Sequence, residues 1–406
     1  MSLFDTLVHL PLVAWLAIAI LSCYGLFDCV STLKPPPRIS QHPRIALIVP
    51  VRGSPAHFSA LWNSICSQTL AARRVIFAIE SENDAAAQAI RYFSGIHHDV
   101  IVAGPTFGRA QKIHNLIAAL EDLKEDDEVV VFADADIIPD NDWLLRLVAP
   151  LAEQEVKIVS GYRWMTPSDD RWSSAFVCVA NASIATTPRS PIWNLAWGGS
   201  IALRRDTLGD LDLVNLWDRA APDDLTLTHA AHKIGCHITC PQSLLVPSPT
   251  SMNWREAIAF GRRQYLFTRW SAPGHWALAA AATTLPVVGW SFALPLAFSG
   301  SNIALATIVA VNVLDQVRAS LRRRVSRILW GAEMPTRMAW LDRWGTPVWL
   351  TFHAMIIWST LFGRSVHWAG RTYSIDSNGN VLRVIEFGMM PQTSVEMSSA
   401  NSAQEP

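Results

Sequence analysis

Hydrophobic residues form one long uncharged run at the start of the chain. The run from Leu7 to Leu26 contains no Asp, Glu, Lys or Arg, and it has about the ~20 residues that a helix needs to cross a bilayer. A cleavable signal peptide would have a basic segment before the run and a small-residue cleavage site after it, and neither is present. We therefore predict a retained transmembrane anchor within residues 1–35.

Shorter apolar runs alternate with helix-like stretches between residues 36 and 270. This alternation predicts an α/β domain, with a mostly parallel sheet that is covered by helices. The predicted helices include Ala110–Leu123 and Trp143–Glu153. The predicted strands are Ile45–Val49, Val75–Ile79, Val100–Val102, Val129–Phe132 and Lys157–Ser160.

Apolar segments return in residues 271–365. Trp276–Phe298 is long enough to span a membrane, whereas Ile303–Leu314 needs its polar flanks to do so, and the pair predicts a membrane hairpin. Thr346–Gly363 has a marginal length. If it crosses, the tail of residues 366–406 is outside the cell, and if it is re-entrant or interfacial, the tail is cytosolic. We expect disorder after about Met389.

Composition and charge support a membrane protein with a large cytosolic domain. Of 406 residues, 50% are hydrophobic and 17% are charged, against about 25% charged in soluble domains. A net charge of −1 gives no reason to expect nucleic-acid binding. Lys34, Arg38 and Arg44 follow the first run, so the positive-inside bias places the next domain in the cytosol. The arginines from Arg318 to Arg327 mark the same side. Without a CxxC pair, the six cysteines are expected to be free thiols.

The clearest chemical signal is Asp134-Ala-Asp136 at the end of a predicted buried strand. Open α/β sheets bind ligands beyond the carboxyl ends of their strands, and residues i and i+2 of an extended chain point the same way. Two carboxylates beside a diphosphate suit Mg²⁺ or Mn²⁺. The alternative is a helix cap or a loop of solvated acids.

Other candidate segments allow two interpretations each. Asp223-Asp224 carries chemistry or begins a helix, since Asp is favoured at helix N-termini. Glu80–Asp84 contacts a nucleotide or is a surface loop, and Gly198-Gly199 approaches a ligand or is a plain turn. The segment 261–270 binds a diphosphate and a lipid or sugar through its arginines and Trp270, or is an interfacial belt.

Together these segments resemble membrane-bound glycosyltransferases of families 2 and 21, the ceramide glucosyltransferase-like group, over most of the chain. That group has a nucleotide-diphosphosugar-binding α/β domain, the GT-A fold. The matching segments follow the order of the family: Val49–Gly53, Glu82–Ala85, Gln111–Leu116, Asp134–Asp136, Trp197–Ser200, Asp223–Asp224 and Trp368–Tyr373.

The resemblance implies a site and a reaction. The reaction is an inverting transfer of a sugar from a UDP-sugar to a lipid hydroxyl, with Asp134 and Asp136 holding Mg²⁺ or Mn²⁺ and Asp224 acting as general base. Asp223, Gln264, Arg269 and Trp270 are the other implied catalytic residues. The implied donor contacts are Pro50, Arg52, Gly53, Glu82, Asp84, Lys112, Asn115, Asp134, Gly198 and Gly199.

Two positions depart from the family pattern. The (Gln/Arg)-x-x-Arg-Trp motif places Gln or Arg at position 266, where this chain has Leu266, and the nearest glutamine is Gln264. Asp84-Ala85 lacks the usual proline. These departures concern the acceptor and the fine donor contacts.

Two other functions compete with lipid glycosylation. A processive polysaccharide synthase of the cellulose or hyaluronan type shares the domain but needs a larger transmembrane bundle. A catalytically silent membrane scaffold needs no base at Asp224. We expect an integral protein of a bacterial inner membrane, with UDP-sugar and a lipid as its partners.

Overall fold

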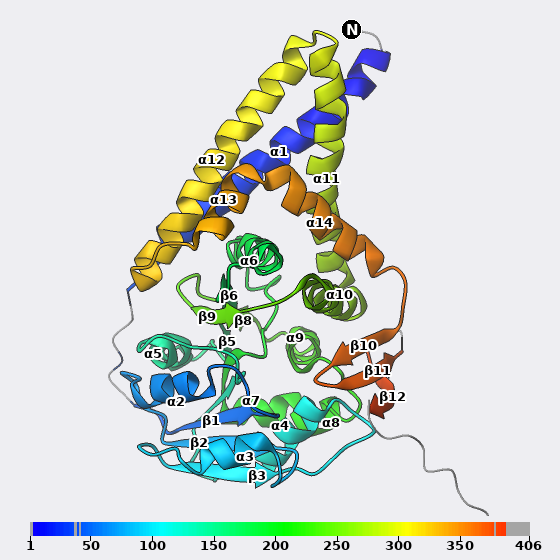
Figure 1. Cartoon of the computed structure of the whole chain (residues 1–406). Helices are drawn as coiled ribbons and strands as arrows, with labels where there is room; N and C mark the ends of the chain where they lie inside the picture. Colours follow the sequence, from blue (N-terminus) through cyan, green and yellow to red (C-terminus); the bar gives the residue numbers. More distant parts are fainter. Residues whose placement is uncertain (1–2, 36–38, 40–41, 377–378, 387–406) are drawn as a thin grey trace, which may run out of the picture.

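The computed structural model describes residues 3–35, 39, 42–376 and 379–386. Long apolar helices extend from one end of an α/β domain, and a layer of shorter helices lies between the long helices and the sheet of that domain (Figure 1). The predicted disorder after Met389 falls outside the described residues.

The α/β domain is built on a seven-stranded mixed sheet in the order β3-β2-β1-β4-β7-β5-β8. β1 pairs in parallel with β2 and β4, β2 pairs in parallel with β3, and β7 runs antiparallel to β4 and β5. The predicted α/β class is therefore confirmed, with β7 as the antiparallel member. The strands are β1 Ile45–Pro50, β2 Arg74–Ile79, β3 His98–Val102, β4 Val129–Ala133, β5 Ile158–Ser160, β7 Ser200–Arg204 and β8 Ile238–Thr239.

Both faces of this sheet are buried, which explains the continuous apolar runs in its central strands. Successive side chains of a strand point to opposite faces. Ala46 and Ile48 accordingly join a core with α4, α7, α8 and α9, whereas Leu47 and Val49 join a second core with α2, α3 and α5. These helices are α2 Phe58–Cys66, α3 Ala85–Ile90, α4 Gln111–Glu121, α5 Trp143–Val148 with the 3₁₀ turn Ala149–Ala152, α7 Arg205–Leu211, α8 Leu213–Leu216 and α9 Asp223–Lys233.

A second layer separates the sheet from the long helices (Figure 1). A two-stranded parallel pair, β6 with β9, packs beneath α6. Next to it, α10 packs against α6, α9, α11 and α14. The elements of this layer are β6 Tyr162–Pro167, α6 Trp172–Ala185, β9 Leu245–Thr250, α10 Trp254–Ser271, α13 Thr336–Trp344 and α14 Thr346–Ser359.

In the part of the chain that the structure describes, three helices are long and apolar enough to cross a membrane: α1, α11 and α12. α1 runs from Leu3 to Thr32, α11 from Pro273 to Phe298, and α12 from Asn302 to Trp330. The three pack together as a bundle. α12 is one continuous helix that contains both the apolar run 303–314 and the arginines after it, so the basic cluster is the end of a span and not a separate segment.

The third apolar stretch of the C-terminal region is too short to span. α14 has 14 residues, about 21 Å at 1.5 Å per residue, against a hydrocarbon core of about 30 Å. It packs against α10, α11 and α6. This geometry favours the interfacial alternative for residues 346–363.

The described part of the C-terminal tail forms an antiparallel sheet of β10 Ser365–Trp368, β11 Arg371–Ile375 and β12 Val381–Glu386. Val366, Tyr373 and Ile375 are buried in the same core as β1 and α4. The C-terminal residues thus complete the α/β domain, on the same side of the spans as the main sheet.

Candidate active site

Asp134 and Asp136 follow β4 directly, and both carboxylates face basic side chains. Arg163 of β6 lies with Nη2 3.3 Å from Asp134 Oδ2 and 3.0 Å from Asp136 Oδ1. The same guanidinium lies over the ring of Trp197, 5.2 Å from its centroid. Burial lowers the pKa of Arg163, but the two carboxylates outweigh burial and raise it. Arg163 is therefore a permanent cation beside this acidic pair.

Lys112, near the start of α4, joins the two acidic motifs. Its Nζ lies 2.8 Å from Asp134 Oδ1 and 2.9 Å from Asp223 Oδ2. Burial would raise the pKa of Asp134, but Lys112 and Arg163 reverse that effect and lower it. The structure thus brings together residues that are far apart in the sequence, around one ammonium group.

Gly198 has no side chain because the site leaves no room for one. A Cβ at this position would lie 2.3 Å from Asp223 Oδ2 and 2.9 Å from Lys112 Nζ. At Gly199, a Cβ would lie 2.2 Å from the ring of Trp197. Both glycines are therefore required by close packing around the charged groups.

Asp223 and Asp224 begin α9 but differ in their surroundings. Asp223 is 6% exposed and pairs with Lys112, whereas Asp224 accepts hydrogen bonds from the N–H groups of Gly198 and Leu225, at 3.0 and 2.7 Å. Burial and the negative charge of Asp223 raise the pKa of Asp224 to about 6, against the opposing effect of Lys112. The N-cap of α9 is Pro222, so neither aspartate is the capping residue itself.

The donor set around Asp134 and Asp136 suits a hard divalent cation that is also bound by a ligand. Among the described residues there is no group of three or more His, Cys, Asp and Glu side chains that could hold a metal ion. Two carboxylates together with substrate phosphates and water are the usual ligands of Mg²⁺ in phosphate-binding sites. The residues therefore fit a metal ion that is completed by a diphosphate.

A second group of predicted residues lies at the ends of β1 and β2. Asp84 caps α3 through Ala86 N–H and also accepts from Gly53 N–H, at 2.8 Å each. Gly53 has a φ of 69°, which favours glycine. Pro50 is the last residue of β1, and Glu80 directly follows β2. Arg52 Nε lies 3.6 Å from Glu80 Oε2. Glu82 is exposed. Asp84 thus shapes the loop, and Glu80 is the acid that is paired with basic residues.

Arg371 connects this second group to α4. It is 2% exposed, and it donates to Glu80 Oε1 at 2.5 Å and to Gln111 Oε1 at 2.6 Å. Gln111 donates to Asn115, and Asn115 donates to the carbonyl of Ala78 in β2. Asn115 is therefore occupied with holding α4 against the sheet.

The predicted residues of α10 lie on different faces of that helix. Gln264 is exposed, and Leu266 is 3% exposed in the domain core. Trp270 packs against the same core, and the Arg269 guanidinium lies 5.9 Å from its ring centroid. Within the described residues, no hydrogen bond or ion pair joins Arg269 to the acidic residues. Arg263 is the arginine of this helix that lies near Asp134 and Asp136.

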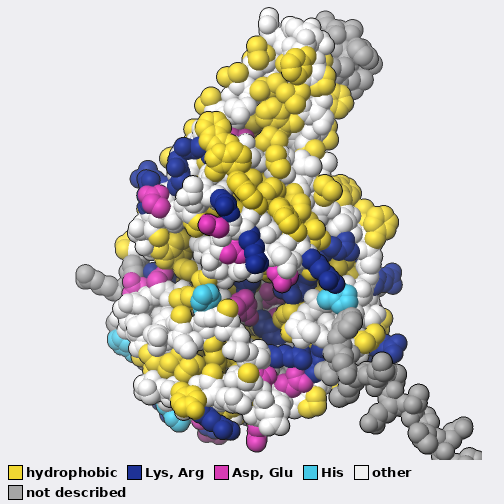
Figure 2. Space-filling view, in the orientation of Figure 1, with side chains coloured by type: hydrophobic (Ala, Val, Ile, Leu, Met, Phe, Trp, Pro, Cys, Tyr) yellow, Lys and Arg dark blue, Asp and Glu magenta, His cyan; other side chains and the backbone are white. Residues whose placement is uncertain are grey.

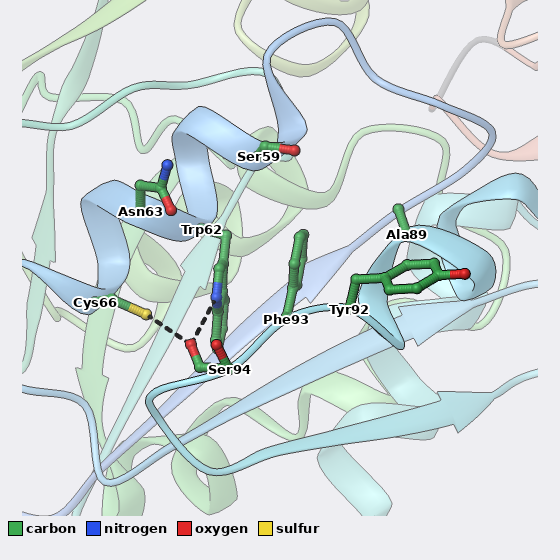
Figure 3. A pocket seen from close by; sticks show the side chains of 8 residues that line it. All are labelled: Ser59, Trp62, Asn63, Cys66, Ala89, Tyr92, Phe93 and Ser94. Atoms are coloured by element: carbon green, nitrogen blue, oxygen red, sulfur yellow. Dashed lines mark hydrogen bonds between the residues drawn. The ribbon is translucent and has the colours of Figure 1, made fainter.

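Charged side chains line a hollow between the α/β domain and the helical layer (Figure 2). A second depression, of about 390 Å³, lies between α2 and the end of α3. There the rings of Trp62 and Phe93 stack at 4.8 Å, and Cys66 and Ser94 lie beside them (Figure 3). Its lining contains no acidic or basic side chain, so it does not compete with the charged hollow as a diphosphate site.

The sequence profile of one family covers most of the chain and defines it as a glycosyltransferase. The chain belongs to glycosyl transferase family 21, whose sequence profile matches residues 13–381. No curated protein matches the chain.

Solved structures give partial likenesses. A mannosyltransferase from Pyrobaculum calidifontis, solved with GDP-Man and Mn²⁺, is 19% identical, with a TM-score of 0.43 over 79% of this chain and 100% of that one. Glucosyl-3-phosphoglycerate synthase from Mycobacterium tuberculosis, solved with phosphoglyceric acid, is 17% identical, with a TM-score of 0.35 over 62% of this chain and 80% of that one.

Sequence reasoning missed three site residues: Arg163, Arg263 and Arg371. Arg371 lies inside the family-like segment Trp368–Tyr373. Arg263 lies in the segment 261–270, for which the sequence left two interpretations open. For Arg163 no local pattern was available, because its place depends on the pairing of β6 with β9.

Proposed function

We propose that this glycosyltransferase transfers a sugar, with inversion and with a divalent metal ion, from a UDP-sugar to the hydroxyl group of a membrane lipid. The observation that carries the proposal is the position of the acidic site beneath helices that lead into the membrane. Arg263 of α10 is close enough to Asp134 and Asp136 for their charges to affect its pKa, and α10 packs against α11 and α14.

The donor half of the proposed site combines acids with permanent cations. Asp134 and Asp136 would hold Mg²⁺ or Mn²⁺, which supplies Lewis-acid stabilisation of the leaving diphosphate when bound. Arg163 and Lys112 lie within 3.3 Å of these carboxylates. With Asp134 and Asp136 bound to a metal ion, Arg163 and Lys112 would be available as partners for the phosphate oxygens of the donor.

Asp224 is the proposed general base. A pKa of about 6 leaves its carboxylate ionised at neutral pH but basic enough to accept a proton. The acceptor hydroxyl loses its proton to Asp224, its oxygen forms a bond with the anomeric carbon, and the bond from that carbon to the phosphate oxygen breaks. UDP leaves on the opposite face of the sugar, which inverts the configuration. The hydrogen bond from Gly198 N–H fixes the Asp224 carboxylate for this step.

A lipid acceptor is supported by the surface of the intermediate layer. Large apolar side chains are exposed on α10, α13 and α14, next to the spans. Aromatic residues in such positions are typical of a membrane interface. The exposed residues of this group are Trp254, Ile258, Trp340, Trp344, Val348, Met355 and Trp358.

The test is sugar transfer by the purified full-length protein in lipid nanodiscs. UDP-[¹⁴C]sugars are incubated with a crude lipid extract and Mn²⁺, and products are separated by thin-layer chromatography. We expect a lipid-soluble labelled product that disappears in EDTA and returns with Mg²⁺ or Mn²⁺. Insoluble polymer would indicate a polysaccharide synthase instead, and no incorporation from any UDP-sugar would indicate a scaffold. Full activity in EDTA would remove the metal ion from the mechanism.

The control is an Asp136→Asn variant, which loses one proposed metal ligand but nearly keeps the shape of the side chain. It should lose Mn²⁺-dependent UDP binding in calorimetry. Because the protein offers two carboxylates, Mn²⁺ should also bind more weakly without UDP than with it.

A further inference from the structure

A pocket of about 270 Å³ lies between α10 and the turn that joins β10 to β11. Its lining is basic and aromatic, without an acidic residue. The turn itself is tight, with positive φ values of 49° at Ala369 and 76° at Gly370. The lining residues are Arg263, His367, Trp368, Ala369, Gly370 and Arg371.

The two arginines of this pocket have different surroundings. Arg371 is engaged with Glu80 and Gln111, and it fastens the turn to the ends of β2 and α4. Arg263 lies over the rings of Trp368 and Phe260, 5.5 Å from each centroid. Among the described residues, no hydrogen bond or ion pair to the Arg263 guanidinium is found. Its N–H groups are therefore free to bind a ligand in the pocket.

Electrostatics explain what that ligand must be. Burial and the nearby charge of Arg163 lower the pKa of Arg263 to about 10, and Asp134 and Asp136 compensate only in part. Arg263 is partly exposed, and a cation that is largely held away from water without a paired anion is costly. An anion that enters the pocket would remove this cost and would meet a planar donor group stacked on an aromatic ring.

We propose that Arg263, stacked on Trp368, is the anion-binding side chain of a phosphate subsite between α10 and the β10–β11 turn. The inference rests on the proposed function, because two phosphates reach this place in such a reaction. One is the donor diphosphate, since Arg263 lies near Asp134 and Asp136. The other is the phosphate of a lipid headgroup, since α10 continues into the span α11.

The experiment measures binding to the full-length protein in detergent with Mn²⁺, by isothermal titration calorimetry. The probes are UDP, UMP, uridine and dihexanoyl phosphatidic acid, a soluble lipid phosphate. The variants are Arg263→Gln and Arg263→Lys, and the matched control is Arg255→Gln, which removes an exposed charge from the same helix. Charge-assisted hydrogen bonds of this kind predict about a tenfold loss for Arg263→Gln. Arg263→Lys should lose less, and the control should lose nothing.

The pattern of losses identifies the phosphate. Weaker UDP binding with unchanged UMP and uridine binding assigns the subsite to the donor diphosphate. Weaker binding of dihexanoyl phosphatidic acid alone assigns it to a lipid phosphate, and a loss of both assigns a subsite open to either. Unchanged affinity of Arg263→Gln for both UDP and dihexanoyl phosphatidic acid would overturn the proposal. It would also be overturned if both Arg263 variants lost as much affinity for uridine as for the phosphates, because uridine has no phosphate group.

The failure of the proposed function looks different. In that case the wild-type protein itself would bind UDP no better with Mn²⁺ than without it.

Discussion

At the scale of single residues, the site balances four aspartates against Lys112 and Arg163, and it has no room for a side chain at residue 198. Lys112 holds Asp134 and Asp223 within hydrogen-bonding distance of one ammonium group. Gly198 lies against this pair, and its N–H group binds Asp224. The position of each charged group therefore depends on the absence of a side chain at residue 198.

Gly198→Ala should separate activity from folding. The added methyl group would lie 2.3 Å from Asp223 Oδ2, so the acid must move. Misplacement of a catalytic group by about 1 Å costs about 10²-fold, and we expect a loss of that order in sugar transfer. The control is Gly209→Ala in α7, where a Cβ meets nothing within 4 Å. Equal activity of the two variants would contradict this account of Gly198.

The activity should rise with pH through the titration of Asp224. The base acts when it is ionised, and its pKa is about 6, so turnover should increase from pH 5 to 7 and then level off. Asp223 and Lys112 are the charged groups that set this value, in opposite directions. Asp224→Asn should lower transfer about 10²–10⁴-fold and remove the acidic limb. A pH–rate profile with donor at saturation measures both, and an unchanged limb would assign the titration elsewhere.

The sequence located the acids of the site and Lys112, but not Arg163. Asp134-Ala-Asp136 was recognisable because it ends an apolar strand, and the expected position at a strand end was found. Arg163 was not recognisable, because it stands between Tyr162 and Trp164 in a strand whose residues do not follow the pattern of a buried strand. Its role follows from tertiary pairing alone.

At the scale of elements, buried charged side chains hold α13 against α12. Asp342 of α13 is 1% exposed and pairs with Arg322, and the Arg318 guanidinium lies 3.9 Å from the same carboxylate. Arg318 also donates to the carbonyl of Asp342 and to Thr346 at the start of α14. Part of the basic cluster is thus a structural joint, in addition to its place at the end of a span.

Asp342→Asn should destabilise the protein more than the loss of an exposed pair. Removing one partner of a buried ion pair costs about 3–5 kcal/mol, because the other charge stays buried. This corresponds to a melting temperature lower by roughly 5–10 °C. The control is Glu333→Gln, whose pair with Arg327 is exposed and should matter little. Thermal melts of the variants are compared in one detergent. Equal melting temperatures would contradict the role of the Asp342 ion pair in holding α13 against α12.

Elements were predictable where burial on two faces gives a simple pattern. β1, β2, β4 and β5 match the predicted apolar runs because helices cover both faces of their sheet. β3 also matches its predicted run, although it lies at the edge of the sheet and Val100 and Val102 are exposed. β9 contains two prolines, which argue against a strand from sequence, and it is tolerated in a two-stranded pair. β10 to β12 are short and partly exposed, so no regular alternation of apolar and polar residues identified them as strands.

At the scale of the whole molecule, the contacts of the C-terminal sheet predict the parity of the membrane crossings, that is, whether their number is even or odd. Arg371 touches Glu80 and Gln111, so both ends of the α/β domain lie on one side. This agrees with two crossings between them, α11 and α12, and with an interfacial α14. The sequence left this parity open because the length of residues 346–363 is marginal.

Cysteine labelling from the outside of intact cells tests this topology. Ser168→Cys on the α/β domain and Ser365→Cys at the start of β10 are exposed and should both be protected, because we place them in the cytosol. Ser299→Cys, between α11 and α12, should be labelled, since it lies at the opposite end of the spans (Figure 1). Labelling of only one of the first two would contradict the shared side, and labelling of both would reverse the orientation.

The contact of Arg371 with Glu80 also sets an order of biosynthesis. A ribosome completes Glu80 and Gln111 early, then α11 and α12, and only then the strand that carries Arg371. Chains that end after Gly363 should therefore enter the membrane and yet bind UDP at least tenfold more weakly than the full chain, by calorimetry. Native UDP affinity in such a shortened chain would refute this. Translation itself then delays the finished enzyme until its spans are made, so that a half-made chain cannot consume nucleotide sugar.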